Sequence, residues 1–127
     1  MYTWKVICFL FFATVFTVSL KGQASNEEIS IAFSKGRANN LVEYLDNNIS
    51  LKISSKEGYY SKNQAEEILQ SFFKKVHPYN FNIIQKGFSG NATFYIGILR
   101  TEKKTYKILY YINSEKNNLI QEIQVIE

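Results

Sequence analysis

The sequence predicts an α+β domain in which a curved antiparallel sheet wraps around one long helix, with two short helices before it. Two patterns carry this prediction. Apolar residues recur at helical spacing between Ser61 and His77, and four β-rich runs then follow without another helix. Size and composition agree, because 127 residues with 46% hydrophobic and 20% charged residues suit one globular domain.

The first 24 residues are typical of a signal peptide. Lys5 precedes an uncharged apolar run over 6–20, Lys21 ends the run, and Gly22-Gln23-Ala24 provides small residues for cleavage. We expect cleavage after Ala24 and export to the periplasm or the outside of the cell, which leaves 25–127 as a single domain. The alternative is an uncleaved membrane anchor, although the run is shorter than the roughly 20 apolar residues of a span.

Two short helices are expected at the start of this domain. Ser25 and Glu28 form a capping-box pattern, and Gly36 is placed to end the first helix. Apolar residues at helical spacing over 41–45 indicate a second helix, which the polar run 46–48 should end.

A hairpin then leads to the long helix. Residues 49–53 alternate between apolar and polar and predict a strand, 56–58 read as a turn, and 59–60 as a short return strand. Ser61 should cap the long helix together with Gln64. The apolar stripe of that helix consists of Ala65, Ile68, Leu69, Phe72, Phe73 and Val76.

The remaining chain predicts strands alone. His77-Pro78 ends the helix, because a residue before proline disfavours the helical conformation. The four β-rich runs are 81–86, 92–101, 105–113 and 119–126. Their connections are short, which favours an antiparallel meander with the helices on one face.

Several segments carry a resemblance to a known family. They are Ile31-Ala32-Phe33-x-x-Gly36, Leu41-x-x-Tyr44, Gly58-x-Tyr60-Ser61-Lys62-x-Gln64-Ala65, Phe72-Phe73, Pro78, Phe81, Gly87 and Tyr95-Ile96-Gly97-x-Leu99. With them the chain resembles the small exported bacterial proteins of domain-of-unknown-function family 4783, within the nuclear-transport-factor-2-like, or cystatin-like, superfamily. The resemblance covers nearly all of 29–126. It implies a signal peptide and a cone-shaped fold, but no established activity.

The inventory of reactive residues is small. Cys8 lies within the predicted signal peptide, and with a single histidine the mature chain offers no zinc site and no cysteine–histidine pair. Removing Lys5 and Lys21 lowers the net charge from +4 to +2, without a basic stripe for nucleic acid. We therefore expect no metal, no cofactor and no nucleic-acid partner.

Enzymes of the superfamily place Asp, His and Tyr in the cone, so an isomerase- or dehydratase-type acid–base enzyme is an alternative. The sole aspartate, Asp46, stands beside two asparagines, where a role in local backbone hydrogen bonds is expected. The sole histidine, His77, stands at a helix end and reads as a cap. Catalysis is therefore not expected.

Tyrosines suggest a possible ligand site. Tyr106 and Tyr110 alternate along one strand and should share a face, which Phe94 could join from the strand before. With Tyr60, these residues could line an apolar pocket with phenol hydroxyls as polar handles, suited to a small apolar ligand. The simpler interpretation is core packing, because aromatic residues favour strands.

If the opposite face of the same strands faced only solvent, its residues should be polar. Instead Tyr95, Leu99, Leu109 and Tyr111 recur there, which predicts a homodimer interface. Three functions remain open: an exported binding protein for a small apolar ligand or a protein partner, an acid–base enzyme, and an interaction module whose cone is filled. An open or filled cone separates the last from the other two.

Overall fold

The computed structural model describes residues 21–115 and 117–127, so residues 1–20 of the predicted signal segment lie outside it. The helices are α2 (Lys21–Lys35), α3 (Ala38–Leu41), the 3-10 turn η2 (Val42–Tyr44) and α4 (Lys62–Val76). The strands are β1 (Leu45–Ile53), β2 (Lys56–Ser61), β3 (Pro78–Ser89), β4 (Ala92–Thr101), β5 (Thr105–Asn113) and β6 (Leu119–Ile126). Within those described ranges, no helix is long and apolar enough to cross a membrane.

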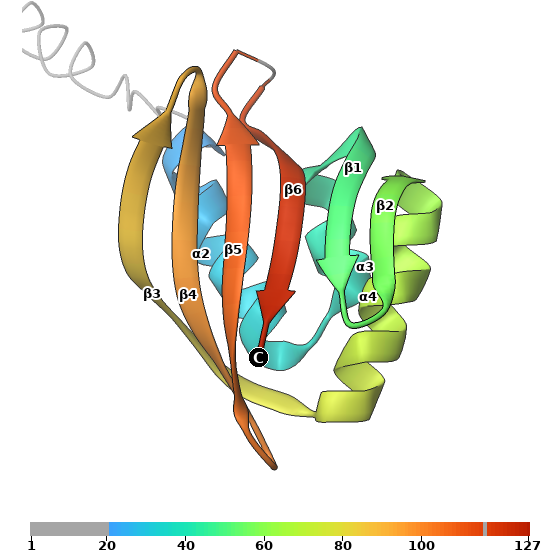
Figure 1. Ribbon diagram of the computed structural model, residues 1–127. Helices are drawn as coiled ribbons and strands as arrows, with labels where there is room; N and C mark the ends of the chain where they lie inside the picture. The colour runs from blue at the N-terminus through green and yellow to red at the C-terminus, as the bar shows by residue number, and fades with distance from the viewer. Residues whose placement is uncertain (1–20, 116) are drawn as a thin grey trace, which may run out of the picture.

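All six strands form one open, curved sheet in the order β2-β1-β6-β5-β4-β3 (Figure 1). The predicted meander of the last four strands is confirmed, because β3 to β6 pair consecutively and antiparallel. One pairing departs from an all-antiparallel sheet: β1 lies parallel to β6. The sheet is therefore mixed, since the last strand returns beside the first in the same direction.

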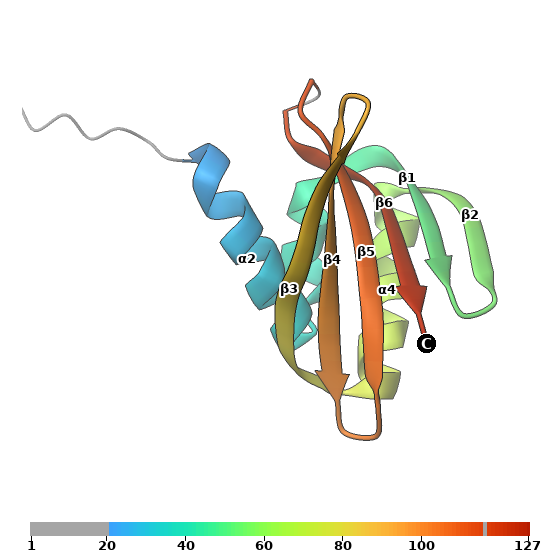
Figure 2. The ribbon, with the colours of Figure 1, turned by 60° about the vertical axis from the view of Figure 1, so that its left-hand side comes forward.

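The helices cover one face of the sheet, as Figures 1 and 2 show. Helix α2 packs against β3, while α4 packs against β1 and β2 at the other side. The face toward the helices is called the inner face here, and the opposite one the outer face. Alternating residues on the strands point inward, which places the core between the two layers.

Helix α4 forms as the sequence predicts. The Ser61 hydroxyl accepts a hydrogen bond from the Gln64 amide, and the Gln64 side chain accepts one from the Ser61 amide. His77 ends the helix in a left-handed conformation, with φ of 53°. The buried stripe consists of Ala65, Leu69, Phe72, Phe73 and Val76. Burying a large apolar side chain contributes about 1.5–3 kcal/mol, so this stripe fixes α4 to the sheet.

Three local predictions were wrong. Ser25 does not begin the first helix, because α2 already starts at Lys21 and so encloses Ser25. The polar run 46–48 does not end a helix but lies in β1, between Leu45 and Ser50, which both pair with β6. The hairpin turn falls at Ser54-Ser55, and residues 56–58 belong to β2. Ser54 adopts a φ of 52° there.

Candidate functional site

The space between the sheet and the helices is filled by the chain's own aromatic rings. Tyr110 of β5 is fully buried, and its ring centre lies 5.9 Å from that of Phe33 and 5.1 Å from that of Tyr95. The Phe33 ring also lies 4.9 Å from that of Phe81. Rings at such separations are in favourable contact. The interior therefore serves as packed core rather than as a chamber for a ligand.

Two buried polar atoms have no hydrogen-bond partner among the described residues, the Tyr110 hydroxyl and the side-chain oxygen of Asn26. The Tyr110 hydroxyl is buried without a hydrogen bond, and its burial raises the pKa of Tyr110 above the ordinary value. Nearby, the Asn26 amide donates to the Tyr95 hydroxyl at 2.8 Å. The sequence offered no signal for the Asn26 contact, which joins positions 69 residues apart. Tyr110 is thus a buried core residue and not an accessible polar handle.

The predicted ligand residues do not come together. Tyr110 pairs with Tyr95 across the β4–β5 ladder, whereas Phe94 pairs with Tyr111 on the outer face, 5.8 Å between ring centres. The prediction that Phe94 shares a face with Tyr106 and Tyr110 was therefore wrong. A shift of one residue in register moves every side chain of a strand to the other face, and the loop between these strands sets that register.

The other two predicted ligand residues lie apart in the fold. Tyr60 is half-buried on β2 and packs against the core near α4. Tyr106 on β5 is 7% exposed and contacts Phe72, with 5.3 Å between ring centres. Tyr106 alone of the predicted four therefore reaches a hollow that the structure shows, described below.

The predicted dimer residues divide between the two faces. Tyr95 and Leu99 point inward and are 8% and 0% exposed, so their assignment to the outer face was wrong. Leu109 and Tyr111 do lie on the outer face, half-buried by neighbours. The apolar row on that face consists of Phe94, Ile96, Ile98, Leu109 and Tyr111.

A groove opens at the end of the cone where α4 ends and the β4–β5 hairpin projects. Two hollows of about 330 and 460 Å³ share Ser54, Phe72 and Lys75, and we call them together the mouth groove. Phe72 and Tyr106 supply an aromatic floor. The charged residues along the larger hollow are Lys75, Glu102, Lys103, Lys104 and Glu127, with His77 beside them.

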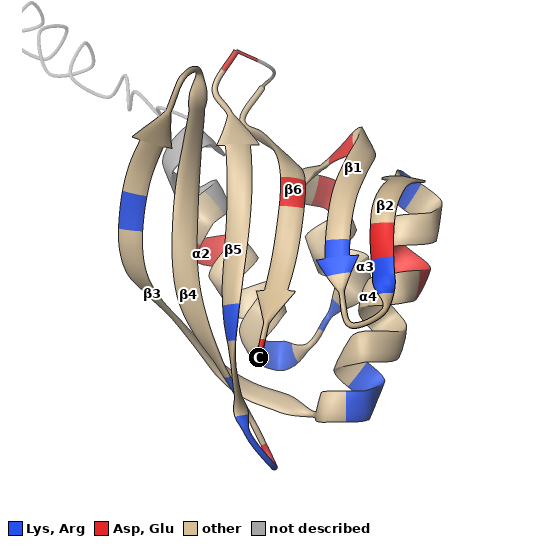
Figure 3. Cartoon of the chain, viewed as in Figure 1, with Lys and Arg blue, Asp and Glu red and all other residues tan. Residues whose placement is uncertain are grey.

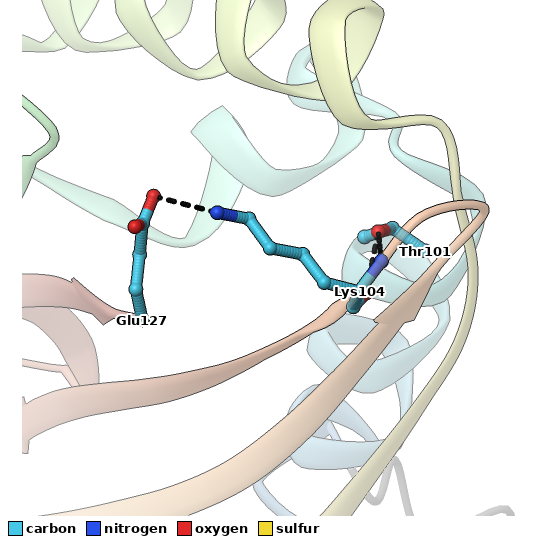
Figure 4. A network of polar contacts seen from close by, with 3 residues as sticks. All are labelled: Thr101, Lys104 and Glu127. Atoms are coloured by element: carbon cyan, nitrogen blue, oxygen red, sulfur yellow. Dashed lines mark hydrogen bonds and ion pairs between the residues drawn. The ribbon is translucent and has the colours of Figure 1, made fainter.

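Polar contacts shape one wall of the mouth groove (Figure 4). The Thr101 hydroxyl donates to the Lys104 carbonyl at 2.5 Å and accepts from the Lys104 amide at 3.2 Å, which closes the β4–β5 hairpin. The Lys104 ammonium lies 3.2 Å from the Glu127 carboxylate, and this hydrogen bond raises the pKa of Lys104. Both side chains are exposed, so this ion pair is worth little energy and can open to a ligand.

A third hollow, of about 550 Å³, lies on the outer face and is lined mainly by polar residues of β1 and β6. Asp46 and Glu122 both line it, together with the rings of Tyr59 and Tyr111. The Asp46 carboxylate accepts a hydrogen bond from the Asn47 amide at 2.7 Å, which confirms its expected local role. The hollow has no buried aromatic floor and suits water better than an apolar ligand.

Carboxylates and histidine stay out of the interior in the part of the chain that the structure describes. Thr101 is the one buried polar residue there. His77 is exposed at the end of α4. General acid–base catalysis needs a titratable group held against the substrate, and burial commonly tunes the pKa of such a group. Among the described residues, neither a carboxylate nor the histidine is buried in the cone.

Comparison with known proteins places the chain in a family. Residues 26–126 match the family model described as a domain of unknown function, DUF4783. The chain belongs to the DUF4783 family. This match confirms the resemblance seen in the sequence, and it spans almost all of the described residues. No curated protein matches the chain.

Crystal structures of DUF4783 proteins share this fold. A protein from Bacteroides fragilis YCH46 is 27% identical with a TM-score of 0.73, covering 79% of this chain and 95% of that one. One from Bacteroides uniformis ATCC 8492 is 26% identical with a TM-score of 0.73, covering 80% and 94%. A protein of ketosteroid isomerase-like fold from Catenulispora acidiphila DSM 44928, in complex with trimethylamine, is 7% identical with a TM-score of 0.59, covering 80% and 83%. That last likeness concerns the fold alone and confirms the predicted α+β architecture.

Proposed function

We propose that this DUF4783 protein is exported and binds, without catalysis, a small molecule with an apolar body in the mouth groove. The observation that carries the proposal is the division of the cone into a packed interior and an open, aromatic-floored end. A filled interior leaves no space for the ligand site expected from the sequence at Tyr110. The larger hollow of the mouth groove, about 460 Å³, lies within the usual range of ligand pockets, about 300–1,000 Å³.

The lining indicates how such a ligand would lie. Its apolar body would contact the small exposed parts of Phe72 and Tyr106, each of which is 7% exposed. An anionic group would suit Lys75 and Lys103, because neither forms an ion pair within the described residues. The proposed ligand is therefore an apolar molecule with at most one negative group.

The proposal of a non-catalytic role is supported by the composition of the cone. Its buried residues in the described ranges are apolar apart from Thr101. A hydrolase or isomerase would need a positioned acid or base near the substrate. Export is supported by the signal-peptide pattern of the first 24 residues.

The fluorescent probe 1-anilinonaphthalene-8-sulfonate, an apolar ring system with one sulfonate, tests the groove. We expect saturable binding to the folded chain, and its loss in Lys75→Trp, because Lys75 is exposed and lines both hollows. Lys74→Trp is the matched control, since Lys74 is the adjacent exposed residue of α4 and lies outside both hollows. Cooperative unfolding of each variant checks that the probe does not report a loosened core. Equal binding by wild type and Lys75→Trp, or none by wild type, would contradict the proposal.

A further inference from the structure

Exposed apolar side chains gather at one border of the molecule. Seven large apolar residues of the described chain are more than a third exposed, and five of them lie on α2 and β3. These five are Ile31 (44%), Tyr79 (64%), Ile83 (37%), Ile84 (60%) and Phe88 (76%). We call them, with the free side of β3, the β3 edge. Single exposed apolar residues are common, so what distinguishes this border is that four of them lie on one strand and the fifth on the helix packed against that strand.

The β3 edge is also an open end of the sheet. Strand β3 is 12 residues long and pairs only with β4, so alternate backbone amides and carbonyls face away from the sheet. Such an edge is a template for another strand unless charge, shortness or a bulge protects it. The opposite edge is protected in this way, because β2 has six residues and carries Lys56 and Glu57. In Figure 3, β2 shows both charge colours and β3 a single blue band.

We propose that a second copy of this chain pairs with the β3 edge, antiparallel and across a two-fold axis, so that the two sheets become continuous. The strand is compatible with itself, because Lys86 is its one charged residue. Any two-fold register except the one centred on Lys86 places that lysine opposite a neutral residue. The Lys86 ammonium already lies 5.7 Å from the Phe88 ring, so the same cation–ring contact can form between the copies.

The available area fits a weak dimer. Aromatic side chains offer about 200 Å² each, so Tyr79 and Phe88 together expose roughly 280 Å². The three isoleucines bring the apolar surface to about 500 Å², and the strand backbone adds to it. The total approaches the roughly 600–800 Å² per partner at which specific interfaces begin. Register irregularities between Pro78 and Asn80 and between Ile83 and Gln85 interrupt the edge and limit the pairing, which keeps the association weak.

The outer face of the sheet is the competing interface. Its apolar row also has five residues, Phe94, Ile96, Ile98, Leu109 and Tyr111, but all of these side chains are only partly exposed. Its strands β4 and β5 are paired on both sides, so their backbones have no free hydrogen bonds to offer. The β3 edge combines both driving forces, exposed apolar surface and unpaired backbone.

Sedimentation equilibrium of the exported chain, from about 1 to 100 μM, tests the pairing at the concentrations where small interfaces associate. We expect a dimer in the upper part of this range, and Phe88→Lys should raise its dissociation constant about tenfold or more. Two controls should leave it unchanged. Tyr59→Lys removes the most exposed ring of the described residues, on the other edge, and Leu109→Lys charges the outer face.

Hydrogen exchange gives a second measurement that does not depend on a substitution. Amides on the free side of β3 should exchange more slowly at 100 μM than at 1 μM, while the amides of β2 should not change. A chain that stays monomeric at about 100 μM overturns the proposal. So does a dimer that Leu109→Lys dissociates and Phe88→Lys leaves intact, since that result assigns the contact to the outer face.

Discussion

Gly97, in the middle of β4, offers the sharpest test of how the core is packed. Its backbone is not in the left-handed region, so conformation alone does not require glycine there. A Cβ atom added at Gly97 would lie 2.2 Å from the Phe81 ring and 3.0 Å from the Asn82 carbonyl oxygen. The ring cannot simply move away, because it is 6% exposed and packs against Phe33. Gly97→Ala should therefore strain both β3 and the interior.

The magnitude follows from two opposing effects. Overpacking a filled core costs about 1–3 kcal/mol. Replacing a glycine in a strand by alanine returns about 0.5–1 kcal/mol. We expect Gly97→Ala to lower the free energy of unfolding by about 1–2 kcal/mol in urea denaturation followed by circular dichroism.

Gly87 supplies the matched control. A Cβ there would also meet a ring at 2.2 Å, but the ring is Phe94, which is partly exposed on the outer face and can shift toward solvent. Gly87→Ala should thus change stability by less than about 0.5 kcal/mol. In a Phe81→Leu background the cost of Gly97→Ala should fall by about half. Equal costs for the two glycines, or no loss for Gly97→Ala, would refute the packed interior.

Three further predictions concern single side chains. Tyr110→Phe removes a buried hydroxyl that lacks a partner, so its free energy of unfolding should match or exceed the wild-type value by up to about 1 kcal/mol; a loss above that size would reveal a hidden partner. The Tyr44 hydroxyl donates to the Glu28 carboxylate, which raises the pKa of Tyr44 to about 12. The stabilisation from this bond should be complete below pH 10, the ordinary pKa, and lost as the pH rises through about 12. Tyrosine absorbance titrated against pH should show this late step, and Tyr44→Phe should abolish it. Ser61→Ala breaks the capping box of α4 and should cost about 1 kcal/mol in the same denaturation assay, whereas no cost would mean that water replaces the cap.

The sequence predicts an element correctly where its local preferences agree with its place in the fold. For helix α4, the capping box, the apolar stripe and the ending before Pro78 all lie within one continuous segment of the sequence. The strands β4 and β5 have alternating patterns of eight or more residues and a short charged loop, so their bounds were predicted to the residue. Such elements need little information from the rest of the fold.

The failures occurred where distant pairing decides the outcome. The run 46–48 has the composition of a helix end, yet it lies in a strand because β1 pairs with β6 on both sides of it, at Leu45 and from Ser50 onward. The faces of β4 and β5 depend on a register that the alternation alone does not fix, since both faces of these strands carry apolar residues. Because of that ambiguity, Phe94 was assigned to the same predicted ligand site as Tyr110, and Tyr95 to the same predicted dimer interface as Leu109.

The candidate site itself was only partly within reach of the sequence. Tyr106 was singled out from its strand, but its partner in the mouth groove, Phe72, was seen as helix core alone. The groove forms where the end of α4 meets a hairpin about 30 residues later in the chain. No periodicity within one element can indicate a hollow that two elements create together.

We propose above all that a ligand binds in the mouth groove and not inside the filled cone, and native mass spectrometry tests this most directly. The chain would be purified after export from its own host and measured beside Lys75→Trp and Lys74→Trp. We predict a bound small molecule on the wild type and on Lys74→Trp, and a bare chain for Lys75→Trp. A bare wild-type chain, or a molecule retained equally by Lys75→Trp, would contradict the account.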